Sequence, residues 1–306
     1  MGSASVTARA PAKINLQLAV GAPRRDGFHD VATAYHAISL YDEVTASPAG
    51  RLTVTVTGAD DLPVHDVPQD GNNLAAAAAV ALARHIGVAP SVHLHITKGI
   101  PVAGGMAGGS ADAAAALVAC NELWDAGLTR SDLTQLASGL GSDVPFSLVG
   151  GTALGMGRGE VLTPVLARGQ FEWVVAIAAG GLSTPAVYAE CDRLRSDHVQ
   201  PQPRVSDDMM TALRAGDAAG VGRAMHNDLQ AAAVSLHPVL ERTLEAGRAA
   251  GALGALVSGS GPSVVLLAHD RAHADDLATA LAVSGACRTV KLALGPVPGA
   301  RLAGED

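Results

Sequence analysis

The chain has few aromatic residues, few cysteines and no long hydrophobic run, and each shortage excludes a class of protein. Phe, Trp and Tyr make up only 3% of its 306 residues, which excludes the extended stacking platforms that bind single-stranded nucleic acid. Cys120, Cys191 and Cys287 are far apart, with no CxxC pair, so a disulfide scaffold or a zinc ribbon is not expected. No apolar run approaches the roughly 20 residues of a spanning helix, and the first residues lack the apolar segment of a signal peptide. We therefore expect a cytoplasmic protein without a membrane partner.

Positive charge is scarce as well. Lys and Arg number 21 against 29 Asp and Glu, so the formal net charge is −8 and the pI is about 5.7. Only Lys13, Lys98 and Lys291 are lysines. An acidic chain has no general attraction for nucleic acid or for an anionic membrane. We therefore expect no nucleic-acid partner, and a polyanionic substrate must be held by a local site.

The composition is that of a globular protein. Hydrophobic residues make up 48% and charged residues 16%, with a mean hydropathy of +0.26, whereas disordered chains are poor in the first and rich in the second. The length predicts about two domains at roughly 150 residues each, which we place at 1–160 and 161–306. Strands and helices mix without strict βαβ alternation, which favours an α+β fold over a doubly wound sheet.

Local patterns predict the elements. Between residues 10 and 20, apolar side chains alternate with Lys13, Asn15 and Gln17, as in a half-buried strand with one polar face. The other strand patterns lie at 51–57, 91–97, 173–179 and 255–267, and the helix patterns at 73–85, 111–124, 129–140, 207–219, 221–234, 238–250 and 271–284. The segments 21–29, 60–71 and 196–208 are expected to be loops.

The helix expected at 129–140 has signals at both of its ends. Thr129 and Asp132 form a pattern similar to a capping box, which marks a helix start. Gly141 is expected to end the helix, because glycine is common just past the last helical turn.

The segment from Pro101 to Ser110, PVAGGMAGGS, is the strongest local signal. Its four glycines allow positive φ angles that turn backbone amides inward, and Ser110 is expected to open a helix whose first amides have no intrahelical partner. These features together predict an anion site suited to a triphosphate. The segment is neither a Walker A motif nor a Rossmann fingerprint. The alternative is a flexible turn before a buried helix.

Two charged residues are candidates for chemistry. A lysine inside a strand, such as Lys13, can point along the polar face into a cleft, and the alternative is a solvated strand lysine. Asp143 lies in the segment GSDVPF, where Pro145 is expected to exclude helix continuation and to push Val144 toward extended geometry. Its carboxylate is placed to accept a proton or to meet Lys13, and the alternative is a turn-forming aspartate.

A second glycine-rich segment, Ser258–Ser263, lies between two apolar runs. It predicts a tight turn between strands or a close approach to another backbone. Taken in order, Pro11–Leu16 (PAKINL), the glycine loop and Ser258–Ser263 resemble the GHMP kinase superfamily. The resemblance covers about residues 9–267.

The resemblance implies a fold and an activity. The fold has an N-terminal domain like the second domain of ribosomal protein S5 and a ferredoxin-like C-terminal domain, with a cleft for ATP between them. Arg25–His29 (RDGFH) and Gly141–Phe146 (GSDVPF) are similar to the GHMP kinases of the non-mevalonate isoprenoid pathway. These enzymes phosphorylate the 2-hydroxyl of a cytidine diphosphate-linked methylerythritol, with ATP as co-substrate and Mg²⁺. The sequence predicts neither the magnesium ligands nor the oligomeric state.

The resemblance also implies roles for single residues. Lys13 and Asp143 match the catalytic pair, Asp143 as general base and Lys13 as its electrostatic partner. The substrate-binding positions are Asn15, Phe28, His29 and Tyr188, of which the two aromatic residues sandwich cytosine. The ATP-binding positions are Asn73, Ala103, Gly104, Gly105, Met106, Ala107, Gly108, Gly109, Ser110 and Ala111.

Two positions depart from the family pattern. Phe28 stands where the family usually has tyrosine, so the stacking face remains and a hydroxyl is lost. Asp112 follows Ser110 and Ala111, where the family usually has Ser-Ser-Asn. Its carboxylate is expected near the phosphates, where it either helps to bind Mg²⁺ or simply suits a helix N-terminus.

Two other functions stay open at this point. One is a different small-molecule GHMP kinase, such as a homoserine or mevalonate kinase, against which the segments RDGFH and GSDVPF argue. The other is a non-catalytic nucleic-acid binder with the S5-like fold. The net charge of −8 and the lack of a basic stripe argue against it.

Overall fold

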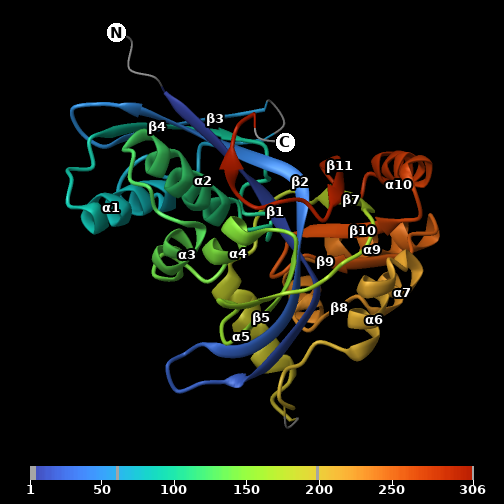
Figure 1. Cartoon of the computed structure of the whole chain (residues 1–306). Coiled ribbons are helices and arrows are strands. Elements are labelled where there is room, and N and C mark those ends of the chain that lie inside the picture. Colours follow the sequence, from blue (N-terminus) through green and yellow to red (C-terminus); the bar gives the residue numbers. More distant parts are fainter. Residues whose placement is uncertain (1–4, 60–61, 198–199, 305–306) are drawn as a thin grey trace.

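The computed structural model describes residues 5–59, 62–197 and 200–304. Within them, twelve strands form two sheets and ten helices pack around these. Figure 1 shows α1 to α4 gathered on one side of the long strands β1 and β2, with α6, α7, α9 and α10 on the other side. This arrangement is mixed α+β, as the sequence predicts.

The first sheet has eight strands, and its central path runs in the order β12-β1-β2-β4-β3. Short strands extend it: β5 pairs with β2, β6 with β5, and β8 with β1. The strands are β1 (Val6–Pro23), β2 (His29–Pro48), β3 (Thr53–Gly58), β4 (Val92–Lys98), β5 (Thr152–Met156), β6 (Val161–Pro164), β8 (His226–Asn227) and β12 (Arg301–Leu302).

The second sheet has four antiparallel strands in the order β11-β7-β10-β9. They are β7 (Phe171–Ile177), β9 (Gly254–Val257), β10 (Ser263–Ala268) and β11 (Thr289–Gly295). Numbered along the chain, this order is 4-1-3-2, with helices in the first and last connections. It is the β-α-β-β-α-β pattern of a ferredoxin-like unit, which confirms that expectation.

The helices fall into two groups along the chain. Those that follow strands of the first sheet are α1 (Leu74–Ile86), α2 (Gly108–Leu123), α3 (Arg130–Ser138) and α4 (Val144–Val149). Those associated with the second sheet are α5 (Thr184–Leu194), α6 (Asp207–Ala215), α7 (Ala218–Ala224), α8 (Gln230–Leu236), α9 (Val239–Ala249) and α10 (Arg271–Ser284). Among the described residues, no helix is both long and apolar enough to span a bilayer.

Helix α2 occupies the centre of the N-terminal core. It packs against α1 on one side and against β1 and β2 on the other. Nine of its side chains are buried, five of them alanines between Ala111 and Ala116. Small side chains let α2 approach its neighbours closely. Because the helix is buried on most of its surface, its apolar residues are not confined to one face. This packing fixes the start of α2, which follows the glycine loop.

Strand β1 differs from its expected environment. Its apolar face is buried as predicted, but Lys13, Asn15 and Gln17 on the other face are only 7%, 2% and 8% exposed. The prediction of a half-buried strand is therefore wrong, because both faces are covered. Gln17 Nε2 donates to Ser206 Oγ at 2.8 Å, and a Cβ at Gly259 would lie 3.4 Å from Asn15 Oδ1. Segments from the C-terminal half of the chain therefore cover the polar face.

Several element boundaries differ from the predictions. Helix α2 begins at Gly108, before Ser110, and α3 ends at Ser138, with Gly139 at its C-cap in place of Gly141. The capping box of Thr129 and Asp132 is confirmed. The helix expected at 221–234 is wrong, because β8 interrupts it and leaves α7 and α8 as separate short helices.

The expected extended geometry at Val144 is also wrong. Val144 is the first residue of α4, and Pro145 occupies the first turn of that helix. A proline is tolerated there, since the first amides of a helix have no intrahelical acceptor. Pro145 therefore starts a helix, which leaves Asp143 at its N-cap position.

The structure also contains elements that the sequence patterns do not reveal. Strand β2, helix α5 and strands β5, β6 and β11 lack the clean alternation or helical spacing of the others. The expected loop at 60–71 includes residues 60 and 61, and the loop at 196–208 includes 198 and 199, which lie outside the described residues. Residue 160, the predicted domain boundary, lies between the paired strands β5 and β6.

Candidate active site

A cavity of about 700 Å³ lies between the N-terminal sheet and α5. Parts of β1, the glycine loop, α5 and the β9–β10 turn all line it, so the two halves of the chain share it. The predicted site residues that line it are Lys13, Asn15, Phe28, His29, Ala103, Gly104, Gly105, Ala107, Gly108, Gly109, Ser110, Asp143 and Tyr188.

Three predicted ATP-binding residues do not line this cavity. Asn73 caps helix α1: its Oδ1 accepts a hydrogen bond from the Ala75 amide at 2.8 Å, and its Nδ2 donates to the Pro68 carbonyl at 2.7 Å. The side chains of Met106 and Ala111 are buried in the core. Met106 still contributes to the loop, because its carbonyl accepts from the Lys13 amide at 3.2 Å.

The ammonium of Lys13 and the carboxylate of Asp143 meet in this cavity. Lys13 Nζ lies 3.5 Å from Asp143 Oδ2. It also donates to Asn15 Oδ1 at 2.9 Å, and Asn15 Nδ2 in turn donates to Thr33 Oγ1 at 2.7 Å. Because each side chain of this series holds the next, the Lys13 ammonium is fixed in direction although its side chain is long.

A third side chain, which the sequence analysis does not single out, completes this group. The Tyr35 hydroxyl donates to Asp143 Oδ1 at 3.0 Å. Burial of the ring, with the nearby Asp143 charge, raises the pKa of Tyr35 well above its usual value, so the hydroxyl stays protonated and remains a donor. Lys13 Nζ lies 5.1 Å from the centre of the same ring. Tyr35 is part of β2, which no sequence pattern predicted.

The glycine loop forms a nest that leads into α2. Ala103, Gly105 and Ala107 all have positive φ angles, and Ala107 is the N-cap of α2 without a side-chain cap. The first turn of this 16-residue helix has no acidic residue. No side chain caps the start of this helix, and Ala107–Ser110 line the cavity. An uncapped helix start that faces a cavity suits a phosphate. Ser258 Oγ donates to the Gly105 carbonyl at 3.4 Å and ties the loop to the second sheet.

Asp112 does not face the phosphate nest. Its side chain is buried, and its Oδ2 accepts from Lys98 Nζ at 2.7 Å. The same ammonium donates to Asp42, whose other oxygen accepts from the amides of Gly99 and Ile100, both at 2.8 Å. Asp112 is thus part of a buried ionic network beneath the start of α2, and neither of its expected roles describes it.

The opposite end of the cavity carries aromatic side chains. Phe28 is 51% exposed, and the guanidinium of Arg158 lies 5.1 Å from its ring centre. The rings of His29 and Tyr188 lie 4.9 Å apart. Burial raises the pKa of Tyr188 to about 12. His29 Nε2 also lies 2.9 Å from Asp192 Oδ1. Arg158 and Asp192 were not predicted from the sequence. The only signal available for Asp192 was the hydrophilic segment that follows Tyr188.

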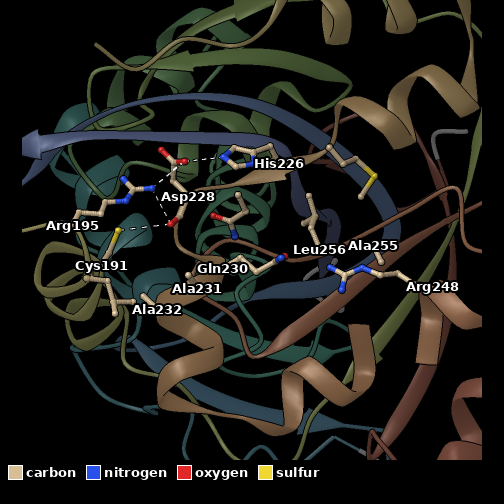
Figure 2. A pocket seen from close by; sticks show the side chains of 13 residues that line it. Cys191, Arg195, His226, Asp228, Gln230, Ala231, Ala232, Arg248, Ala255 and Leu256 are labelled. Carbon is tan, nitrogen blue, oxygen red and sulfur yellow. Dashed lines mark hydrogen bonds and ion pairs between the residues drawn. The ribbon is translucent and has the colours of Figure 1, made fainter. Parts of the chain in front are cut away.

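A second cavity, of about 470 Å³, lies against α5, β8 and β9 (Figure 2). In it Asp228 meets His226 at 2.8 Å and Arg195 at 3.0 Å. Asp228 Oδ2 also accepts from the Val20 amide at 2.7 Å, and Arg195 donates to the Val20 carbonyl at 3.2 Å. Through these contacts, Asp228 and Arg195 connect β1, β8 and the end of α5. Since β1 and α5 also line the first cavity, the same contacts help to fix its walls.

Comparison with known protein families identifies the class. The profile of the GHMP kinases N terminal domain matches residues 73–151, which contain the glycine loop and Asp143. The profile of the GHMP kinases C terminal domain matches residues 209–285. The chain has the fold of this class of small-molecule kinases.

Full-length relatives narrow the class. The chain is 58% identical to the 4-diphosphocytidyl-2-C-methyl-D-erythritol kinase of Streptomyces avermitilis, over 97% of this chain and 99% of that one. It is 56% identical to the enzyme of the same name from Thermobifida fusca, over 97% of both chains. The chain belongs to the 4-diphosphocytidyl-2-C-methyl-D-erythritol kinase family of the GHMP kinases.

Solved structures agree with this assignment. A crystal structure of 4-(cytidine 5'-diphospho)-2C-methyl-D-erythritol kinase superposes with a TM-score of 0.75 at 31% identity, over 95% of this chain and 99% of that one. A homoserine kinase from Cytophaga hutchinsonii superposes with a TM-score of 0.73 at 18% identity, over 97% of both chains. The second likeness shows the shared fold alone.

Proposed function

We propose that this enzyme transfers the γ-phosphoryl group of ATP to the 2-hydroxyl of 4-diphosphocytidyl-2-C-methyl-D-erythritol, a step of the non-mevalonate route to isoprenoid precursors. The name shared by its full-length relatives supports the substrate. One observation carries the chemistry: the Lys13 ammonium and the Asp143 carboxylate lie 3.5 Å apart in the cavity that the uncapped start of α2 lines.

Asp143 is the proposed general base. The acceptor hydroxyl is tertiary, so it is crowded and a weak acid. Asp143 accepts its proton as the new oxygen–phosphorus bond forms. Tyr35 donates to one carboxylate oxygen and Lys13 faces the other. These two contacts orient the carboxylate in the cavity, and the ammonium also stabilises negative charge that develops on the attacking oxygen.

The glycine loop is the proposed phosphate site. The free amides at the start of α2 and the positive end of its dipole favour a polyanion. The chain has few cations, so backbone amides take the place of basic side chains in this nest. Phosphoryl transfer depends mainly on positioning and on stabilising charge on the transferring group. Backbone donors held by Lys13, through the Met106 carbonyl, and by Ser258 supply both.

Mg²⁺ usually binds through one or two protein oxygens together with the substrate phosphates. Among the side chains that line the cavity, Ser110 carries a hydroxyl oxygen and belongs to the glycine loop, so it fits that mode. The ion would add positive charge beside the phosphates. Asp112 is not available for it, because its side chain is buried against Lys98.

The aromatic end of the cavity is the proposed cytidine site. Phe28, Tyr188 and His29 all line the cavity. The two aromatic rings offer faces for stacking, and the imidazole offers a hydrogen-bonding edge. Stacking on an aromatic side chain contributes about 1–3 kcal/mol per base. Asn15, which accepts a hydrogen bond from Lys13, also lines the cavity. It is the proposed contact for the methylerythritol moiety as that moiety approaches the general base Asp143.

A substrate panel tests the proposed function. Purified enzyme with ATP and Mg²⁺ is offered the cytidine diphosphate-linked alcohol, homoserine and mevalonate in parallel, and ADP release is measured. We expect turnover of the cytidine compound alone. The proposal would be contradicted if homoserine or mevalonate were phosphorylated and the cytidine compound were not.

A further inference from the structure

One wall of the proposed cytidine site contains a hydrogen-bonded pair, a histidine and a carboxylate, that the mechanism does not use. His29 Nε2 lies 2.9 Å from Asp192 Oδ1 and 3.2 Å from Asp192 Oδ2. His29 is the first residue of β2, and Asp192 belongs to α5, so the pair joins the two halves of the chain across the cavity. Both residues line the cavity. The His29 side chain is 7% exposed, which leaves it few other orientations.

The carboxylate determines which ring nitrogen carries the proton. An ionised carboxylate only accepts hydrogen bonds, so Nε2 must donate to it. A neutral imidazole has one donor and one acceptor nitrogen. Nδ1 of His29 is then the acceptor, and no hydrogen bond from the described residues engages it. The ring of Tyr188, 4.9 Å away, packs against the imidazole and limits its rotation.

We infer that Asp192 is a positioning residue for base selection: by holding the Nε2–H of His29, it leaves Nδ1 to accept a hydrogen bond from the exocyclic amine of cytosine and to repel the carbonyl that uracil carries at that position. The inference rests on the proposed function, because it assumes that the aromatic end of the cavity binds the base. A site built to pair with an amine discriminates against a carbonyl, since two acceptors then face each other unpaired.

Asp192→Asn is the informative change, because the amide is of the same size and both donates and accepts. Nε2 of His29 can then be donor or acceptor, so Nδ1 is no longer fixed as an acceptor. We expect the KM for the cytidine diphosphate-linked substrate to rise about tenfold, with kcat at saturation within twofold of wild type. The preference for the cytidine substrate over its uridine diphosphate-linked counterpart should fall by about the same factor.

Two further variants separate positioning from general structure. Asp192→Glu keeps an acceptor and should restore most of the base preference. Asp208→Asn makes the same chemical change at an exposed residue of α6, far along the chain from the cavity lining, and should alter neither parameter.

Two readouts do not need turnover. Calorimetry compares the affinities for cytidine diphosphate and uridine diphosphate. Nitrogen NMR in mildly alkaline buffer reports the His29 tautomer, and the His29 signals are identified by their absence in His29→Gln. We expect protonation at Nε2 alone in wild type and a mixture in Asp192→Asn. An unchanged tautomer with an unchanged affinity ratio in Asp192→Asn would overturn the inference, as would proton occupancy at Nδ1 in wild type. Failure of the wild-type enzyme to phosphorylate the cytidine substrate would contradict the proposed function instead.

Discussion

At the scale of single residues, a small number of side chains in the site each make several contacts. The Lys13 ammonium contacts Asn15, Asp143 and the face of Tyr35. Tyr35 in turn holds one oxygen of Asp143. A change at any of these residues therefore alters the surroundings of the proposed base, and the size of the effect should follow the chemistry that each group supplies.

Asp143→Asn should abolish most turnover while leaving the nucleotide site intact. The amide cannot accept a proton from the substrate hydroxyl, and loss of a general base typically costs 10²–10⁴-fold. Single-turnover kinetics would measure kcat, and calorimetry with a non-hydrolysable ATP analogue would measure affinity. We expect the affinity to change less than threefold. Near-full turnover would remove Asp143 from its proposed role.

Tyr35→Phe tests the hydroxyl that holds Asp143. The ring and its contact with Lys13 remain, and only the 3.0 Å hydrogen bond is lost. A hydrogen bond to a charged group contributes about 1.5–3 kcal/mol, so kcat should fall about 10-fold to 100-fold, with little change in either KM. Tyr41→Phe, on the same strand but outside the cavity lining, is the matched control and should behave as wild type.

At the scale of elements, two features set the position of α2. One is the ionic network of Asp42, Lys98 and Asp112, in which two carboxylates share one ammonium. Burial, with the nearby Asp42 charge, raises the pKa of Asp112 well above its usual value. The pKa of Lys98 is also raised, because the attraction of the two carboxylates outweighs the effect of burial. The network therefore favours a protonated Asp112 over a second buried negative charge.

This protonation predicts a stability difference. Asp112→Asn mimics the neutral carboxyl and should change the free energy of unfolding by less than about 1 kcal/mol. Lys98→Met leaves two buried carboxyls without their cation and should cost about 3–5 kcal/mol, as for other broken buried pairs. Urea unfolding, followed by circular dichroism, measures both. Equal losses in the two variants would contradict a neutral Asp112.

The raised pKa of Asp112 also predicts that the stability difference between wild type and Asp112→Asn depends on pH. Between the usual aspartate pKa and the raised pKa of Asp112, the folded protein holds a proton that the unfolded chain has released. The free energy of unfolding therefore falls as pH rises through that window. Asp112→Asn lacks this proton, so its stability relative to wild type should increase as the pH rises above the usual aspartate pKa of about 4. A constant difference across that range would argue against the raised pKa.

The glycine loop is the second feature, and its geometry requires glycine at one position above all. Gly105 has a φ of +73°, and a Cβ there would collide with the Ser258 carbonyl. Gly105→Ala should distort the nest and weaken ATP binding at least tenfold. Gly50→Ala is the control, because a Cβ at Gly50 meets nothing within 4 Å. Calorimetric titration with the ATP analogue distinguishes them, and unchanged affinity in Gly105→Ala would remove the loop from the phosphate site.

At the scale of the whole molecule, Asn227 joins the two sheets behind the active site. It pairs with β1 through β8, and its buried side chain donates to the carbonyls of Val257 and Gly259, both at 2.7 Å. Its Oδ1 accepts from the Leu229 amide at 2.9 Å. The β9–β10 turn, which lines the cavity at Gly259, is therefore fixed to the strand that carries Lys13.

Asn227→Ala should weaken both the fold and the site. Buried backbone groups left without a partner cost about 1–3 kcal/mol each, so the free energy of unfolding should fall by about 2–4 kcal/mol, and kcat should fall with it because the turn loses its position. Asn72→Ala, at an exposed asparagine, should change neither quantity. Unfolding in urea and steady-state assays give the two readouts. Full stability in Asn227→Ala would mean that the sheets are joined by other contacts.

Local sequence patterns predicted part of this structure for a physical reason. The capping box at Thr129 and the turn at Ser258–Ser263 depend on neighbours in the chain, and both are present. The alternation along β1 correctly predicted a strand, but it did not predict that both faces of that strand are buried. Pro145 shows the limit of such rules: the same residue either ends a helix or begins one, and its surroundings decided that it begins α4. Strand β2 and helix α5 escaped prediction because packing against distant segments sustains them.

For the site, the sequence by itself determined the ingredients: a glycine loop before an apolar helix, a lysine on a strand, an aspartate before a proline, and motifs that identify the family. Only the tertiary structure decided which residues these groups contact. It covered the polar face of β1, placed Tyr35 against Asp143 and Asp192 against His29, and paired Asp112 with Lys98 instead of exposing it at the proposed phosphate site. These contacts join residues far apart in the chain, and their energies depend on burial and distance, which no local pattern encodes.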